Sequence, residues 1–288
     1  MPWANFRGNP YIVMMETIVA QQLMHTAMRA ARAAGEVLRG HLGRLRHIET
    51  KNGQQMNLVT EADRAAERSI IANIREDWPE HAILGEESGA HAGAAPYRWI
   101  IDPLDGTTNF THAFPIFSVS IAVEREGHVL AGVVYDPMRD ELFHATRGGG
   151  AFLNDEPIAV STTTELQRAM LVTGFPYNVR ENPNYCRERF IAFLDAAQAV
   201  RRLGSAALDC AWVAAGRLDG FWEVSLQPWD KAAGVLLIEE AGGRVSDFAG
   251  GEHSIYELPI LASNGHIHED MLRVLDEAIL VNITFGRR

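Results

Sequence analysis

The sequence has few cysteines, no long uninterrupted apolar run and fewer basic than acidic residues. Its two cysteines, Cys186 and Cys210, are too few for a disulfide framework, which favours a reducing compartment. No apolar stretch approaches the roughly 18 residues that a membrane-spanning helix needs. The first residues also lack the basic segment and clean apolar core of a signal peptide. We therefore expect a cytoplasmic protein with no membrane partner.

The charge balance is acidic, with 26 Lys and Arg against 37 Asp and Glu and a net charge of −11. Because the sequence has no dominating basic stripe, we expect no nucleic acid as a direct partner. The 288 residues are enough to bury a sizeable core in one large domain or two modest ones.

Helical and strand patterns are mixed along the chain. Helical spacing of apolar residues predicts helices at about residues 16–41, 60–77, 184–199, 230–241 and 268–278. Alternating residues with turn signals predict an antiparallel meander after residue 116. The pattern indicates an α+β or layered α/β fold. We expect an irregular N-terminal extension (1–14) before a single domain (15–288), with an α+β half (15–160) and an α/β half (161–288).

The stretch WIIDPLDGTTNF raises a chemical question, because a buried strand runs into two acids, a proline, a glycine and two hydroxyls. Pro103 is expected to stop the strand and to stiffen the turn. The carboxylates of Asp102 and Asp105 can then converge, with the Leu104 carbonyl turned outward. Two carboxylates and a carbonyl are the hard oxygen ligands that Mg²⁺ prefers.

The residues after this bend favour an anion. Gly106 permits an unusual backbone angle, and the amides of Thr107 and Thr108 can hold a phosphate at the start of a helix. The alternative is an ordinary loop with an Asx-turn and a helix cap. A second Asp-Pro, in YDPMRDE, has no Gly-Thr after it and predicts a plain hairpin turn.

Two further acids are candidates for the same site. Glu86 follows another predicted strand, and its alternative is a solvated loop acid. Asp230 opens a helix, and its alternative is an N-cap. Four carboxylates would repel a phosphate, whereas two divalent cations would make the cluster an anion site. Two-metal sites suit phosphoryl transfer, because the ions stabilise the charge on the phosphate and leaving-group oxygens.

DPLDGTTNF, with GEES before it and WDKAAGVLLIEEAGG after it, resembles the inositol monophosphatase family. RRLGSAALDCAWVAAGRLDGFWEVSLQPWD is similar to its bacterial branch, and the resemblance covers about residues 15–275. It implies a five-layered αβαβα sandwich, Mg²⁺-dependent hydrolysis of a phosphate monoester, lithium sensitivity and a homodimer.

The resemblance also implies roles for individual residues. Glu86, Asp102 and the Leu104 carbonyl would hold a first Mg²⁺, and Asp102, Asp105 and Asp230 a second. A third ion, reached by Glu86 through water, stays open. Thr107 and Glu86 would orient the attacking water, with Asp63 holding the Thr107 hydroxyl in addition to capping its own helix. The substrate-binding residues would be Asp105, Gly106, Thr107, Gly204, Ser205, Ala206, Glu223 and Asp230.

Two of these assignments carry alternatives. Lys51 matches a residue near the loop over the site, although KNGQQMN is one residue longer than the usual spacing. Glu223 can also be interpreted as an exposed acid at the end of a strand.

The Gly-Thr-Thr-Asn that follows Asp105 favours inositol monophosphate as the substrate. Histidinol phosphate, fructose 1,6-bisphosphate and NADP remain alternatives. A regulatory binding protein of the same fold that contacts the transcription machinery is a further one.

Overall fold

The computed structural model describes residues 10–50 and 58–285. Its helices, in chain order, are α1 (Pro10–His41), α2 (Glu61–Asp77), α3 (Thr107–Thr111), η3 (Leu166–Arg168), η4 (Val179–Glu181), η5 (Pro183–Tyr185), α4 (Cys186–Ala196), α5 (Ala206–Ala214), α6 (Pro228–Glu240) and α7 (His268–Phe285). None of the helices in these ranges is both long and apolar enough to cross a bilayer.

The strands fall into a short hairpin and two larger sheets. They are β1 (Ile48–Thr50), β2 (Leu58–Thr60), β3 (Ala82–Gly85), β4 (Gly89–His91), β5 (Tyr97–Asp105), β6 (Ser118–Arg125), β7 (His128–Asp136), β8 (Glu141–Thr146), β9 (Gly150–Leu153), β10 (Glu156–Pro157), β11 (Met170–Thr173), β12 (Ala199–Arg201), β13 (Gly220–Glu223), β14 (Arg244–Ser246) and β15 (Ile260–Ser263).

Both larger sheets are mixed. Within the described ranges, the first has eight strands in the order β10-β9-β8-β7-β6-β5-β3-β4, and β3 and β5 are its parallel pair. The second has five strands in the order β12-β11-β13-β15-β14. Its first three strands are parallel, while β15 is antiparallel to both of its neighbours.

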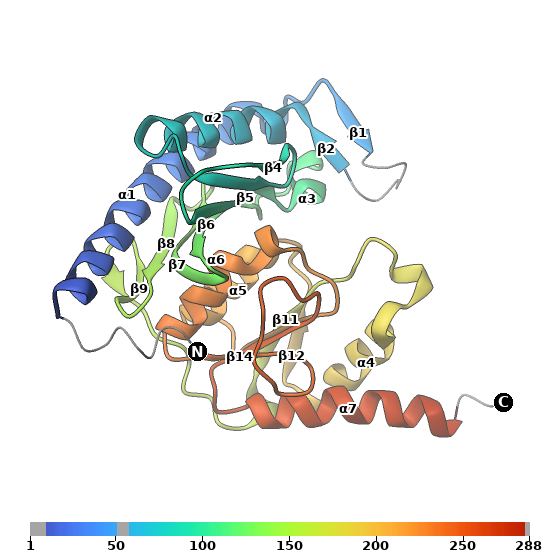
Figure 1. Cartoon of the computed structure of the whole chain (residues 1–288). Helices are drawn as coiled ribbons and strands as arrows, with labels where there is room; N and C mark the ends of the chain where they lie inside the picture. The colour runs from blue at the N-terminus through green and yellow to red at the C-terminus, as the bar shows by residue number, and fades with distance from the viewer. Residues whose placement is uncertain (1–9, 51–57, 286–288) are drawn as a thin grey trace.

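The apolar residues divide into three cores that define the layers. Alternation along β5 places Trp99 and Ile101 in the core beneath α1 and α2, and Ile100 in the core that contains α5 and α6. Phe193 of α4 and Met271 of α7 belong to a third core, on the outer face of the five-stranded sheet. Figure 1 shows the resulting order: α1 and α2, the large sheet, α5 and α6, the small sheet, then α4 and α7. This is the predicted layered αβαβα sandwich.

Several predicted boundaries were wrong. The first helix begins at Pro10, so residues 10–14 are helical and not irregular, while residues 1–9 lie outside the described part. The helix predicted for residues 184–199 covers only Cys186–Ala196, and the last helix extends to Phe285. The division of the domain near residue 160 stays a prediction.

Pro103 does not end its strand, contrary to our expectation. β5 continues to Asp105, and its register against β6 shifts between Asp102 and Asp105, where Pro103 and Leu104 of β5 lie opposite Val119 alone of β6. A proline fits here because a bulge does not require its missing amide hydrogen. The bulge places both aspartates on a fixed strand and not on a free loop.

Candidate active site

The bulge of β5 holds Asp102 and Asp105, both of which are buried. Asp102 Oδ1 accepts a hydrogen bond from the Leu104 amide at 2.9 Å. Gly106 then turns the chain with a φ of 99°, and a Cβ atom there would lie 3.1 Å from the Gly204 carbonyl oxygen. Only glycine fits this close approach without strain, so the bend and the Gly204 segment are in contact.

Asp63 and Thr107 meet beside this bend. The Thr107 hydroxyl lies 3.2 Å from Asp63 Oδ1 and 3.1 Å from the Leu104 carbonyl oxygen. The other Asp63 oxygen accepts from the Thr60 amide at 2.8 Å and completes the capping box of α2. Asp63 therefore makes both predicted contacts at once, since each of its oxygens serves a different partner.

Glu86 follows β3 directly, and its backbone amide donates to the Ile101 carbonyl at 3.1 Å. Its carboxyl group is close enough to that of Asp102 to raise the pKa of Asp102. The adjacent segment is fixed by the buried Glu67, whose Oε2 accepts from the Glu87 amide at 3.0 Å. Glu67 was not found from the sequence, because its position in α2 gives no local sign of this contact.

Asp230 is contributed by α6, from the other half of the chain. The helix starts at Pro228, so Asp230 is its third residue and not its first, as predicted. Asp230 Oδ2 accepts from the Gln227 amide at 2.7 Å. This capping-box contact holds the carboxylate in place at the helix terminus.

The four acids are close enough to oppose one another's ionisation. Burial raises the pKa of Asp102 well above its usual range, and the charges of Glu86, Asp105 and Asp230 raise it further. Burial, followed by the charges of Glu86 and Asp105, likewise raises the pKa of Asp230. Such a cluster is costly unless protons or cations neutralise it.

Hydrogen bonds counter part of this effect at Asp105. Burial raises its pKa to about 6, against the opposing influence of hydrogen bonds from Ser205 and from the Ala207 and Ala206 amides. The Ser205 hydroxyl donates to Asp105 Oδ2 at 2.6 Å, and the Ala207 amide donates to the same oxygen at 2.7 Å. The predicted substrate segment Gly204–Ala206 therefore lies directly against an acid of the cluster.

The donor set of the cluster fits Mg²⁺, because it consists of carboxylate oxygens, of which those of Asp102 and Asp105 belong to buried residues, and a backbone carbonyl. In the ranges 10–50 and 58–285, however, no three His, Cys, Asp or Glu side chains are already gathered at metal-ligand geometry. The acids are thus within electrostatic reach of one another, and together with the Leu104 carbonyl they are the groups that would hold an ion.

Glu223 ends β13 and is buried at 6% exposure, so the alternative of an exposed acid was wrong. Burial raises its pKa to about 8, while the charge of Arg202 lowers it. A Cβ atom on Gly174 would lie 2.0 Å from Glu223 Oε2. The absence of a side chain at residue 174 thus creates the space that the Glu223 carboxyl group occupies.

The neighbourhood of Glu223 contains residues that sequence reasoning missed. Asp209, in the first turn of α5, is fully buried, and burial together with the charges of Asp105 and Glu223 raises its pKa well above the usual range. Arg202 lies beside Gly204. Lys231, directly after Asp230, is buried and donates through Nζ to the Glu257 carbonyl. Lys51 lies outside the described residues.

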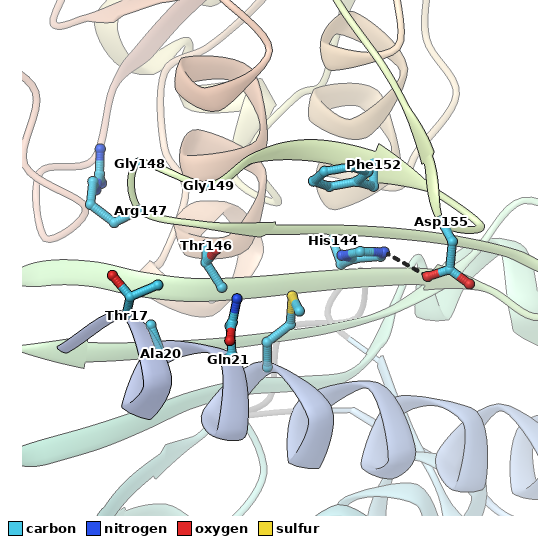
Figure 2. Close-up of a pocket in the computed structure, with 11 residues that line it drawn as sticks. Thr17, Ala20, Gln21, His144, Thr146, Arg147, Gly148, Gly149, Phe152 and Asp155 are labelled. Atoms are coloured by element: carbon cyan, nitrogen blue, oxygen red, sulfur yellow. Dashed lines mark ion pairs between the residues drawn. The ribbon is translucent and has the colours of Figure 1, made fainter. Parts of the chain in front are cut away.

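A cavity of about 310 Å³ lies elsewhere, between α1 and the β8–β9 hairpin (Figure 2). Its lining includes His144, whose Nε2 is 3.5 Å from Asp155 Oδ1 and whose ring stacks on Phe152. It shares no lining residue with the acidic cluster, so the cluster is the better candidate for chemistry.

Comparison with known proteins shows the family to which the chain belongs. The sequence profile of the inositol monophosphatase family matches residues 19–280. The chain is 45% identical to the Nus factor SuhB of Pseudomonas aeruginosa, over 88% of this chain and 96% of that one. It is 42% identical to the inositol-1-monophosphatase of Mesorhizobium japonicum, over 89% and 97%. The solved inositol monophosphatase of Anabaena superposes with a TM-score of 0.81 at 45% identity, covering 89% and 96%.

Proposed function

Because the chain belongs to the inositol monophosphatase family, we propose that it is a Mg²⁺-dependent phosphatase of small sugar or polyol phosphate monoesters, with inositol monophosphate as the preferred substrate. The observation that carries this proposal is the cluster of Glu86, Asp102, Asp105 and Asp230, in which Asp102 and Asp105 are buried and the mutual repulsion of the acids calls for cations.

Glu86, Asp102, Leu104, Asp105 and Asp230 are the residues that would hold two ions, with a third near Glu86 as an option. When bound, Mg²⁺ would stabilise charge on the phosphate oxygens and make water more acidic. Thr107 provides a hydrogen-bond acceptor for this water. Its hydroxyl proton is directed to Asp63 or to the Leu104 carbonyl, so an oxygen lone pair is free to accept a hydrogen bond from the attacking water.

In this mechanism Thr107 orients the water and Glu86 takes its proton, while Asp63 keeps the hydroxyl pointed correctly. The backbone at Gly106 and Thr107 contacts the phosphate. Gly204, Ser205, Ala206 and Glu223 contact the alcohol part, since they line the wall next to Asp105. A carboxyl group suits a ring that carries several hydroxyls.

The test is a panel of esters assayed for phosphate release with and without Mg²⁺. It includes inositol 1-phosphate, histidinol phosphate, fructose 1,6-bisphosphate and NADP, and the first should be hydrolysed with the highest kcat/KM. Hard oxygen ligands should accept Mn²⁺ and be inhibited by the larger Ca²⁺. Lithium inhibition is expected from the family. Full activity in excess chelator would refute the proposal.

We further propose that the protein is a cytoplasmic homodimer. Besides the family, exposed apolar side chains on and before α4 support a second copy as partner, since Ile191 and Leu194 are 58% and 50% exposed and Tyr185 is close by in the chain. Light scattering should give twice the monomer mass, and Ile191→Asp should shift it toward the monomer.

A second role is favoured by the relatives named Nus factor SuhB. We propose that the chain also acts as a regulatory binding protein toward the transcription machinery. Asp102→Asn separates the two roles, because it should abolish hydrolysis and leave binding to the transcription machinery intact.

A further inference from the structure

Arg202 lies next to Gly204, one of the residues that we propose contact the alcohol part of the substrate. It follows β12 and is exposed. A Cβ atom placed on Gly204 would lie 2.7 Å from Arg202 Nη1, so the guanidinium rests directly against the Gly204 backbone. Gly204 in turn contacts the bend at Gly106 through its carbonyl oxygen. The Gly204 backbone therefore lies between the Arg202 guanidinium and the Asp102–Thr107 motif.

The guanidinium of Arg202 has neither a hydrogen bond nor an ion pair with any residue in the described part of the chain. Other arginines differ: Arg217 makes two hydrogen bonds with Glu141, and Arg201 donates to the Val200 carbonyl. Arg202 thus keeps its five donors available beside the buried acids Asp209 and Glu223.

Arg202 also acts electrostatically on the site. Its charge lowers the pKa of Glu223, against the effect of burial. It lowers the pKa of Asp209 in the same way. Both acids lie close to Asp105. An unpaired cation at this position can therefore meet a bound molecule that also reaches the acidic cluster.

We propose that Arg202 binds a second anionic group on the alcohol part of a substrate, so that, of two otherwise similar phosphate esters, the enzyme favours the one that carries an additional carboxylate or phosphate. This inference rests on the proposed phosphatase function and concerns discrimination within such pairs of esters. The planar guanidinium matches either anion with two parallel hydrogen bonds, a geometry that a lysine ammonium cannot reproduce.

The carboxylate is tested with two substrates that differ at one carbon, glycerol 3-phosphate and 3-phosphoglycerate. Arg202→Gln should lower kcat/KM for 3-phosphoglycerate by roughly 10- to 100-fold, the range expected for a hydrogen-bonded charge pair. Glycerol 3-phosphate should lose less than about 3-fold, because it offers no second anion. The Arg202→Lys variant should have a kcat/KM for 3-phosphoglycerate between those of the wild type and Arg202→Gln.

The phosphate is tested in the same way with fructose 1-phosphate and fructose 1,6-bisphosphate. A selective loss in only one of the two pairs identifies which anion Arg202 reads. Arg201→Gln is the matched control, since Arg201 is the exposed neighbour on β12 and contacts only a backbone carbonyl of its own strand. It should change neither ratio.

Equal losses on both members of each pair would overturn the inference, because Arg202 would then act through Glu223 and not on the substrate. No loss on any ester would overturn it as well. Calorimetric binding of glycerol 3-phosphate and 3-phosphoglycerate separates this failure from failure of the function. If Arg202 makes the protein bind 3-phosphoglycerate more tightly than glycerol 3-phosphate but no phosphate is released, the inference about Arg202 holds. The proposed phosphatase activity is then refuted.

Discussion

Asp63 accepts the Thr107 hydroxyl at 3.2 Å across 44 residues of sequence, while its second oxygen caps its own helix. One side chain therefore links the start of α2 to the residue that we propose orients the attacking water. The link allows catalytic and structural contributions to be separated by mutation.

Thr107→Ala should lower kcat by roughly 10²- to 10⁴-fold, the usual contribution of a positioned proton-transfer group. Thr107→Ser keeps the hydroxyl and should retain most of the activity. Thr60→Ala removes the hydroxyl that accepts from the Ala62 and Asp63 amides, and should cost about 1 kcal/mol of stability with a much smaller effect on kcat. Initial rates and urea unfolding of all three variants provide the comparison. Similar kcat losses in Thr107→Ala and Thr60→Ala would mean that Thr107 only supports the fold.

Asp102→Asn should abolish Mg²⁺-dependent turnover and yet stabilise the protein in chelator. Without cations, Asp102 is a buried acid facing Glu86, Asp105 and Asp230, so removal of its charge relieves repulsion. Mg²⁺ at about 100 times its Kd should add about 2.7 kcal/mol to the wild type and much less to the variant. Thermal melts with and without Mg²⁺ measure both effects. A variant that gains as much from Mg²⁺ as the wild type would place the ion elsewhere.

Glu223→Ala should lower kcat/KM for inositol 1-phosphate by roughly 5- to 150-fold, because a substrate hydroxyl loses its partner in a buried site. Glycerol 2-phosphate, with fewer hydroxyls, should lose less. Gly174→Ala should reproduce this pattern, since its Cβ would lie 2.0 Å from Glu223 Oε2 and displace the carboxyl group. Both substrates are measured on the same preparations, so that a general folding defect cancels. Equal losses on the two esters would show that Glu223 supports the site and does not recognise the ring.

His268 should make the protein less stable in mild acid. Burial lowers its pKa to about 4, and its ring nitrogens contact the Ser246 and Ser263 hydroxyls at 2.8 and 2.9 Å. The unfolded chain takes up this proton below about pH 6.5, whereas the folded chain does so only near pH 4. Stability is therefore full above pH 6.5 and declines as the pH falls through this window, by about 2 kcal/mol at pH 5.

His268→Gln removes this titration. Urea unfolding at pH 7 and pH 5 should therefore show a smaller loss in the variant than in the wild type, by about the same 2 kcal/mol. Parallel losses in the two proteins would assign the acid sensitivity to other groups.

Local patterns in the sequence predicted part of the site. The Thr60 and Asp63 capping box and the end of β3 before Glu86 depend on neighbouring residues, and both occur as expected. The bulge at Pro103 was missed, because its geometry depends on pairing with β6. Gly174, Asp209 and Arg202 were missed for the same reason: the proximity of Gly174 to Glu223, of Asp209 to Asp105 and of Arg202 to Glu223 arises only when distant segments meet.

The two hydrogen bonds from Ser205 and Ala207 to Asp105 span 100 and 102 residues of chain. Loops of this length close late in folding, because the entropy cost of bringing their ends together precedes the stabilisation that the contact gives. On the ribosome, the acidic cluster would remain incomplete until α6 has been synthesised. The metal site is therefore expected to form after the main folding step. Magnesium should slow unfolding of the folded protein and leave its early folding rate unchanged.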